Sequence, residues 1–197
     1  MPKDDKPMPP WAEFLQVALA LIAMVVLATM VLSTTCLGPL SASEATVGAI
    51  ETLQPAIEDE RVQELANIID TQAEEHGFDP KLIVAIIMRE SSFSKRVESG
   101  AQKGQLNEIG LMQIHPQNGM AFDLRPTECS RDLEGAYCQI ATGVRYLDWV
   151  RGHCPGTQWR YVAAYGMNRC PSESIARLDM STKRARSLHL KLGGDGW

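Results

Sequence analysis

Glu90 is the residue of this chain whose type and place best suit acid/base chemistry. It follows Ile83, Ile86 and Ile87 by seven, four and three residues, so on a helix the four side chains share one face. A carboxyl group at the end of such an apolar stripe is partly desolvated, and it lies at the negative end of the helix dipole. Both effects favour the protonated acid, the form in which a carboxyl group can donate a proton to a glycosidic oxygen. The alternative is a glutamate that merely ends a helix in water.

The residues before Glu90 predict the helix that would position it. Asp79 can accept hydrogen bonds from the free N–H groups at a helix start, and Pro80 suits the first helical position. Residues 82–88, LIVAIIM, are apolar without a break, which indicates a helix buried on all sides. A buried parallel strand would be equally apolar, but the Asp-Pro start and the following Arg89-Glu90 favour the helix.

The remaining apolar periodicity also indicates helices. The expected helices cover residues 60–76, 138–151 and 157–165. Gly77 is a stop signal for the first, and Thr157 is a suitable N-cap for the last. Residues 94–110 are rich in Gly, Ser, Lys and Gln and should form a loop. Since no repeat and no convincing strand is found, we expect a mainly α domain over residues 58–180.

Four short motifs, beginning at Glu90, occur in a characteristic order. They are Glu90-Ser91-Ser92-Phe93, Gly110-Leu111-Met112-Gln113-Ile114, Gly143-Val144-Arg145-Tyr146-Leu147 and Ala163-Ala164-Tyr165. They resemble the E-S-x-F, G-L-M-Q-I, G-x-x-Y-L and A-A-Y-N-x-G motifs of the soluble lytic transglycosylase domain. Any one of them alone would be weak, whereas four in order are a strong joint signal. The resemblance covers roughly residues 60–170.

The resemblance implies a goose-type-lysozyme-like α fold and cleavage of the MurNAc–GlcNAc β-1,4 bond of peptidoglycan. Glu90 would protonate the leaving oxygen and then deprotonate the C6 hydroxyl of the same muramoyl sugar, which closes on C1 to give a 1,6-anhydro product. The N-acetyl group can assist, so neither a second carboxylate nor a cofactor or metal is required. Most glycosidases do use a carboxylate pair. Glu98 and Glu108, both in the loop, are outside candidates for such a partner.

The resemblance also implies roles for the residues around Glu90. Ser91 would steady the backbone behind it. Met112 and Gln113 would line the sugar groove, Gln113 as a hydrogen-bond partner of the substrate. Tyr165 would place its hydroxyl near Glu90.

Three further positions are less determined. We interpret Tyr146 mainly as a packing residue with a polar tip, and His115 as an exposed loop residue that could touch substrate. The sequence departs from the family after Tyr165, where Gly166 occupies the position of the usual Asn. Asn168 follows two residues later and is a candidate to take over that role along a differently shaped turn.

The N-terminal part predicts a membrane anchor. Residues 14–32 carry no charge and as a helix would rise about 28 Å, close to the hydrocarbon thickness of a bilayer. This length exceeds the apolar region of a signal peptide, so we expect a retained anchor rather than a cleaved signal. Lys3 and Lys6 precede it, and the next basic residue is Arg61. The rule that positive charges stay inside then places residues 1–13 in the cytoplasm and the rest in the periplasm, with the anchor in the inner membrane.

The segments flanking the expected domain look unstructured. Residues 33–57 are rich in Ser, Thr, Ala, Gly and Pro and are interpreted as a periplasmic tether. Residues 181–197 form a basic tail, expected mainly to solvate its own end, with docking on an anionic polymer or on phospholipid as the alternative. The formal net charge of −5 argues against nucleic-acid binding.

The cysteines point to disulfides. Cys36 follows the expected anchor, but the preceding residues match a lipid-attachment box poorly. The other four, Cys129, Cys138, Cys154 and Cys170, form an even set in an oxidising compartment, which favours two disulfides. A zinc site is less suited because no Cys-x-x-Cys pair occurs. We favour the pairs 129–138 and 154–170, and the main rival joins 138 to 170.

Three functions remain in competition. The leading one is a lytic transglycosylase, and a muramidase that uses water on the same fold is its near rival. A peptidoglycan-binding structural component with weak or no activity is the third. A small anchored transglycosylase would suit the wall-opening subunit of a secretion, conjugation or phage-entry apparatus.

Overall fold

The computed structural model describes residues 42–197. The predicted anchor over residues 14–32 and Cys36 lie outside this range. All regular elements within it are helices: α2 (Glu44–Leu53), α3 (Asp59–His76), α4 (Pro80–Glu90), α5 (Lys95–Glu98), α6 (Gly119–Asp123), α7 (Gly135–His153), α8 (Gln158–Met167), α9 (Glu173–Leu178) and α10 (Met180–Lys191). The β-type pairing described there is one isolated bridge between Ile109 and Ile114. The prediction of a mainly α domain is confirmed, and no helix of residues 42–197 is long and apolar enough to cross a membrane.

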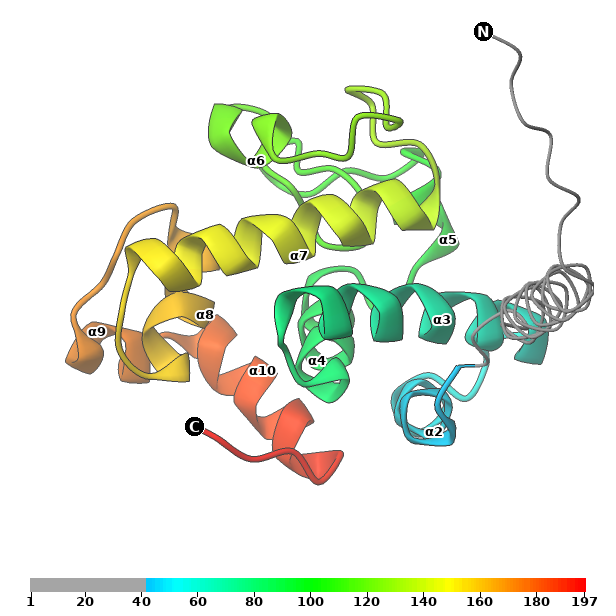
Figure 1. Cartoon of the computed structure of the whole chain (residues 1–197), viewed down its shortest axis with the longest axis horizontal. Helices are drawn as coiled ribbons and strands as arrows, with labels where there is room; N and C mark the ends of the chain where they lie inside the picture. The colour runs from blue at the N-terminus through cyan, green and yellow to red at the C-terminus, as the bar shows by residue number, and fades with distance from the viewer. Residues whose placement is uncertain (1–41) are drawn as a thin grey trace, which may run out of the picture. The chain divides into compact units, whose positions relative to one another are not determined.

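Helix α4 is the central element and packs against α2, α3 and α10 (Figure 1). Its side chains from Leu82 to Ile87 are all buried, as expected for a helix without a polar face. Asp79 caps its start, accepting a hydrogen bond from the Lys81 N–H at 2.9 Å, and Pro80 occupies the first turn. Burying each large aliphatic side chain contributes about 1.5–3 kcal/mol, so this helix is a rigid base for the residues at its end.

Helices α3 and α7 pack along each other, and α8 packs on α7. Helix α3 ends at Gly77, whose left-handed backbone (φ 63°) matches the predicted stop. Helix α7 is longer than predicted at both ends. Helix α8 begins after Thr157 as expected, but the Thr157 hydroxyl binds Glu173 at 2.7 Å instead of capping the helix.

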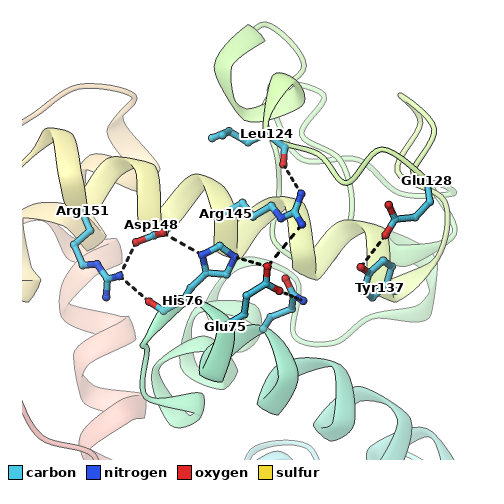
Figure 2. Close-up of polar contacts among 9 residues, drawn as sticks. Glu75, His76, Leu124, Glu128, Tyr137, Arg145, Asp148 and Arg151 are labelled. Atoms are coloured by element: carbon cyan, nitrogen blue, oxygen red, sulfur yellow. Dashed lines mark hydrogen bonds and ion pairs between the residues drawn. The ribbon is translucent and has the colours of Figure 1, made fainter.

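A polar cluster joins the end of α3 to α7 (Figure 2). The Asp148 carboxylate contacts His76 Nδ1 at 3.0 Å and accepts a hydrogen bond from Arg151 at 2.6 Å. Arg151 also donates to the His76 carbonyl oxygen at 2.7 Å. Burial alone would raise the pKa of Asp148, but the hydrogen bonds from His76 and Arg151 outweigh burial and lower it. The ionised carboxylate therefore stabilises this junction.

The predicted tether is too long at its C-terminal end. Residues 44–53 form helix α2, which packs on α3 and α4 and buries Thr46, Ala49 and Ile50. The Thr46 hydroxyl donates to Asp70 of α3 at 2.5 Å. A helix of ten residues depends on tertiary packing for its stability, and composition does not reveal that packing, which is why it suggested a linker here.

The predicted basic tail is also part of the fold. Helix α10 packs on α4 and buries Thr182, Ala185 and His189. Its capping aspartate, Asp179, accepts a hydrogen bond from the Thr182 N–H at 2.6 Å. The Trp197 indole N–H donates to His189 Nδ1 at 2.7 Å. The folded unit therefore spans residues 42–197 rather than the expected 58–180. His189 Nε2 contacts the carboxylate of Asp79, the cap of α4, at 2.7 Å, and this long-range contact helps to dock α10 on α4.

Two disulfides are present among residues 42–197, in the favoured pairing. Cys129 bonds Cys138 and Cys154 bonds Cys170, with Cα–Cα distances of 5.6 and 5.3 Å. Cys138 lies in the first turn of α7, and Cys154 directly follows its last residue. Because a helix of 19 residues is about 28 Å long, Cys170 beside one end cannot reach Cys138 at the other. The rival pairing is therefore wrong, and no cysteine of residues 42–197 is free to bind zinc.

Candidate active site

A cavity of about 410 Å³ lies at the C-terminal end of α4. Its walls come from Glu90 of α4, residues of the segment 104–118, Tyr146 of α7 and the end of α8. The lining is mostly polar and carries carboxyl, amide, hydroxyl and imidazole groups. Such a lining offers a sugar many hydrogen-bond partners around one acid.

Glu90 is the last residue of α4, and its side chain is only 19% exposed. The guanidinium of Arg89, itself 3% exposed, forms an ion pair with the Glu90 carboxylate. This pairing was not foreseen from the sequence, which suggested a carboxyl group surrounded by apolar side chains alone.

The chain turns sharply directly after Glu90. The hydroxyl of Ser91 donates to the Ile87 carbonyl at 3.1 Å, within the last turn of α4. Ser92 and Phe93 then both adopt left-handed backbone conformations, with φ values of 53° and 55°. A left-handed conformation is unfavourable for two consecutive non-glycine residues, so it persists only where the surrounding structure imposes it. Here the burial of the Phe93 side chain contributes to that constraint. Ser91 therefore binds the helix end behind the acid, where the family resemblance had placed it.

The segment Gly110–Ile114 is a tight turn that presents Gln113 to the cavity. The Ile109 and Ile114 backbones bind each other at 2.9 and 2.8 Å, and Gln113 has a positive φ of 50°. The side-chain NH₂ group of Gln113 donates to the Gly110 carbonyl at 2.9 Å, and this side chain lines the cavity. Gln113 is thus placed where a substrate-binding amide was predicted.

A buried glutamine of α7, missed in the sequence analysis, holds this turn in place. Gln139 is 1% exposed, and its side-chain oxygen accepts from the Leu111 N–H at 2.8 Å. Its amide donates to the carbonyls of Glu98 and Leu133 at 2.8 and 3.0 Å. A side chain on Gly110 would overlap that of Gln139, so the glycine permits the approach. The signal available in the sequence was a glutamine directly before Ile140 in the helix predicted over residues 138–151.

Met112 does not line the cavity as predicted. Its side chain is fully buried and packs against Gly143 of α7, where a Cβ atom would lie 2.7 Å from the Met112 Cβ and closer still to its sulfur. The turn that directs Gln113 toward the cavity directs the preceding side chain into the core. This contact explains the glycine at the start of the motif 143–147, because only a residue without a side chain leaves room for Met112 there.

Two tyrosines also line the cavity, and one of them contacts this turn. The hydroxyl of Tyr165 donates to the Met112 carbonyl at 2.8 Å, and burial together with the charge of Glu90 raises the Tyr165 pKa well above its ordinary value. Tyr146 is 5% exposed, with its ring centroid 5.3 Å from that of Tyr165. Both line the cavity that contains Glu90, so Tyr146 combines the expected packing with a polar tip at the site.

Asn168 brings an amide into the cavity wall although Gly166 occupies the family's usual Asn position. It ends α8 in a left-handed conformation with a φ of 55°. Its side-chain oxygen accepts hydrogen bonds from the Tyr146 hydroxyl at 2.7 Å and from the Asn118 amide at 2.6 Å. The side chains of three separate segments therefore meet at this point.

Of the two acids considered as a partner for Glu90, one lines the cavity and the other does not. Glu108 lines the same cavity as Glu90, and its carboxylate accepts from the Leu106 N–H at 2.8 Å. Glu98 lies elsewhere, where it forms an ion pair with Arg61 at 2.5 Å. His115 lines the cavity, and its Nδ1 accepts from the Gln117 N–H at 3.1 Å. Within residues 42–197 no group of three or more His, Cys, Asp or Glu could hold a metal ion.

This arrangement combines the carboxyl groups of Glu90 and Glu108 with amide and hydroxyl groups in one polar cavity. No solved structure matches the chain at a significant level. The family model of the transglycosylase SLT domain matches residues 67–183, which is more than half of the chain and includes all four motifs. The chain therefore belongs to the SLT transglycosylase family, whose members are peptidoglycan-cleaving enzymes of the transglycosylase type.

Proposed function

We propose that this protein is a lytic transglycosylase that cleaves the MurNAc–GlcNAc β-1,4 bond and forms a 1,6-anhydro-MurNAc end. The observation that carries this proposal is the position of Glu90, which enters a polar cavity from the end of a buried helix. A carboxyl group held there can act first as acid and then as base on the same sugar.

The reaction balances with Glu90 as the proton carrier. Protonated Glu90 gives its proton to the glycosidic oxygen as the bond from that oxygen to C1 of the muramoyl sugar breaks. The C6 hydroxyl of the same sugar then attacks C1, and its proton passes to the Glu90 carboxylate. The acid is regenerated and no water is consumed. Gln113 and Asn168 line the cavity beside Glu90 and are the amides available to hold the sugars.

The test is mass spectrometry of the products released from purified peptidoglycan. The full-length protein should release anhydro-muropeptides, and Glu90→Gln should lose at least about a hundredfold in rate, because general acid/base catalysis is typically worth about 10²–10⁴-fold. Glu98→Gln is the matched control, since Glu98 lies outside the cavity. Retention of more than about a tenth of the activity by Glu90→Gln would refute the assignment. Binding without any product release would favour the peptidoglycan-binding component.

A muramidase is the second candidate because Glu108 shares the cavity with Glu90. A second carboxylate could activate water to attack C1, as in glycosidases that use a carboxylate pair. That reaction leaves reducing MurNAc ends, which differ in mass from anhydro ends by one water. If reducing ends dominate and Glu108→Gln abolishes them, the hydrolase assignment replaces the transglycosylase one.

We also propose that the protein is anchored in the inner membrane by residues 14–32, with its enzyme domain in the periplasm. The uncharged run and the lysines before it support this topology, and the two disulfides suit an oxidising compartment. An anchored enzyme of this size would suit local opening of the wall for an envelope-spanning secretion, conjugation or phage-entry apparatus. A periplasm-dependent reporter fused after Trp197 should be active, and the protein should stay in the membrane fraction with its N-terminus intact. A shorter, soluble form would show that the segment is a cleaved signal.

A further inference from the structure

Helix α2 reaches the turn behind Glu90 through the side chain of Gln54. Gln54 directly follows the last residue of α2, and its side-chain NH₂ group donates to the Ser92 carbonyl at 2.9 Å. Ser92 is the second residue after Glu90 and lies in the sharp turn at the end of α4. A residue 38 positions earlier in the chain therefore binds the backbone just behind the acid.

The backbone at Ser92 needs support from outside the turn. Ser92 and Phe93 both have left-handed conformations, which are unfavourable for residues with a side chain. The Ser92 N–H and hydroxyl both donate to the Met88 carbonyl, at 3.2 and 3.3 Å, which joins the residue to α4. Within residues 42–197 the carbonyl of Ser92 accepts a hydrogen bond from Gln54 and from no other group.

The backbone of Gln54 is itself fixed. Its N–H donates to the Ile50 carbonyl at 2.8 Å, and its carbonyl accepts from the Ile57 N–H at 3.2 Å. The Ile50 side chain is fully buried, so the end of α2 is anchored in the core. The bond from Gln54 therefore restrains Ser92 relative to the core of the domain.

A second polar contact between these two segments is weaker. Lys95 Nζ donates to the Glu58 carboxylate at 3.2 Å, but the two side chains are 68% and 78% exposed. An exposed ion pair contributes little, because water screens the charges and two long side chains lose freedom. The half-buried bond from Gln54 to Ser92 is thus the polar contact that can hold the turn.

We propose that Gln54 is a positioning residue for the acid. By holding the Ser92 carbonyl it fixes the turn after α4, and with it the direction in which the Glu90 side chain enters the cavity. Gln54 lies outside residues 67–183, which match the SLT domain, so a helix outside the matched segment shapes the active site. This inference rests on the proposed function, because Glu90 is the proton carrier of that reaction.

The test measures the rate at which Gln54→Met releases muropeptides from peptidoglycan, in the full-length protein and well below its Tm. Methionine keeps the length of the side chain but has no donor. We expect kcat to fall about fivefold, as for the loss of one hydrogen bond. KM should stay unchanged, because Gln54 does not line the cavity. Gln54→Lys restores a donor of similar reach and should recover most of the rate.

The matched control is Thr46→Val, which removes the hydrogen bond to Asp70 from the other end of α2. It should lower Tm but leave kcat unchanged. An equal fall of kcat in Thr46→Val and Gln54→Met would overturn the inference, because Gln54 would then act only by holding α2 on the domain. So would an unchanged kcat in Gln54→Met, or no recovery in Gln54→Lys. If the unsubstituted protein releases no product, the proposed function fails, and the inference fails with it.

Discussion

Replacing Gly143 by alanine should destabilise the protein, although alanine is the better helix former. A Cβ atom at this position of α7 would lie 2.7 Å from the Met112 Cβ, which is attached to the backbone and cannot simply rotate away. Overpacking a core of this kind costs about 1–3 kcal/mol. The gain in helix propensity offsets up to about 1 kcal/mol. We therefore expect a net loss of about 1–2 kcal/mol, which corresponds to about 2–8 °C in Tm for a domain of this size.

The same helix offers a matched control in Gly152. A Cβ atom added there meets nothing within 4 Å, so Gly152→Ala should be neutral or stabilising by up to about 1 kcal/mol. Urea unfolding of both variants gives the two free energies directly. Met112→Ala alone should cost about 2–5 kcal/mol, and in combination with Gly143→Ala the cost should fall below the sum, because the added methyl group fills part of the space.

The Gly143→Ala substitution should also change the active site. Met112 precedes Gln113, and its carbonyl accepts the hydrogen bond of Tyr165. Displacing this turn should raise KM for peptidoglycan in Gly143→Ala but not in Gly152→Ala. If the two variants are equally stable and equally active, contact between Gly143 and Met112 does not determine the shape of this wall.

Three further perturbations test the description of the fold and site. Tyr165→Phe removes the buried hydrogen bond to the Met112 carbonyl and should cost about 1 kcal/mol in urea unfolding and lower turnover; unchanged stability would contradict that bond. Replacing both Cys154 and Cys170 by alanine should cost about 3 kcal/mol in the chain-entropy model, measured by thermal melting; no change in Tm would show that the bridge is absent in the isolated protein. Because the pKa of Asp148 is lowered in the fold, its stabilisation is complete above the unfolded value of about 3.9 and is lost as the pH falls through the lower folded value. Asp148→Asn should therefore flatten the fall of Tm below about pH 4, and a parallel fall in both proteins would argue against this contribution.

The sequence by itself determined the elements whose signals are local. Asp79-Pro80 followed by an unbroken apolar run predicted α4 and placed Glu90 at its end, because capping and uniform burial leave a clear pattern within one segment. The bridge between Cys129 and Cys138 was predictable for a similar reason, since a short polar loop brings the two together. The order of the four motifs was sufficient to identify the family.

Tertiary structure alone decided which side chains share the cavity. The tight turn after Gly110 sends Gln113 outward and Met112 inward, and the sequence pattern does not reveal this division. Glu108 and Glu98 looked equivalent as loop acids, yet one lines the cavity and the other pairs with Arg61.

The helices at both ends of the domain also depended on tertiary contacts. Helices α2 and α10 bury three side chains each, and most of their stability comes from docking on α4 and, for α2, also on α3. Docking of α10 creates a second cavity beside Glu90, with Lys183 and Arg184 in its wall. Such long-range contacts depend on how faces of distant segments meet, which local propensity and periodicity do not encode.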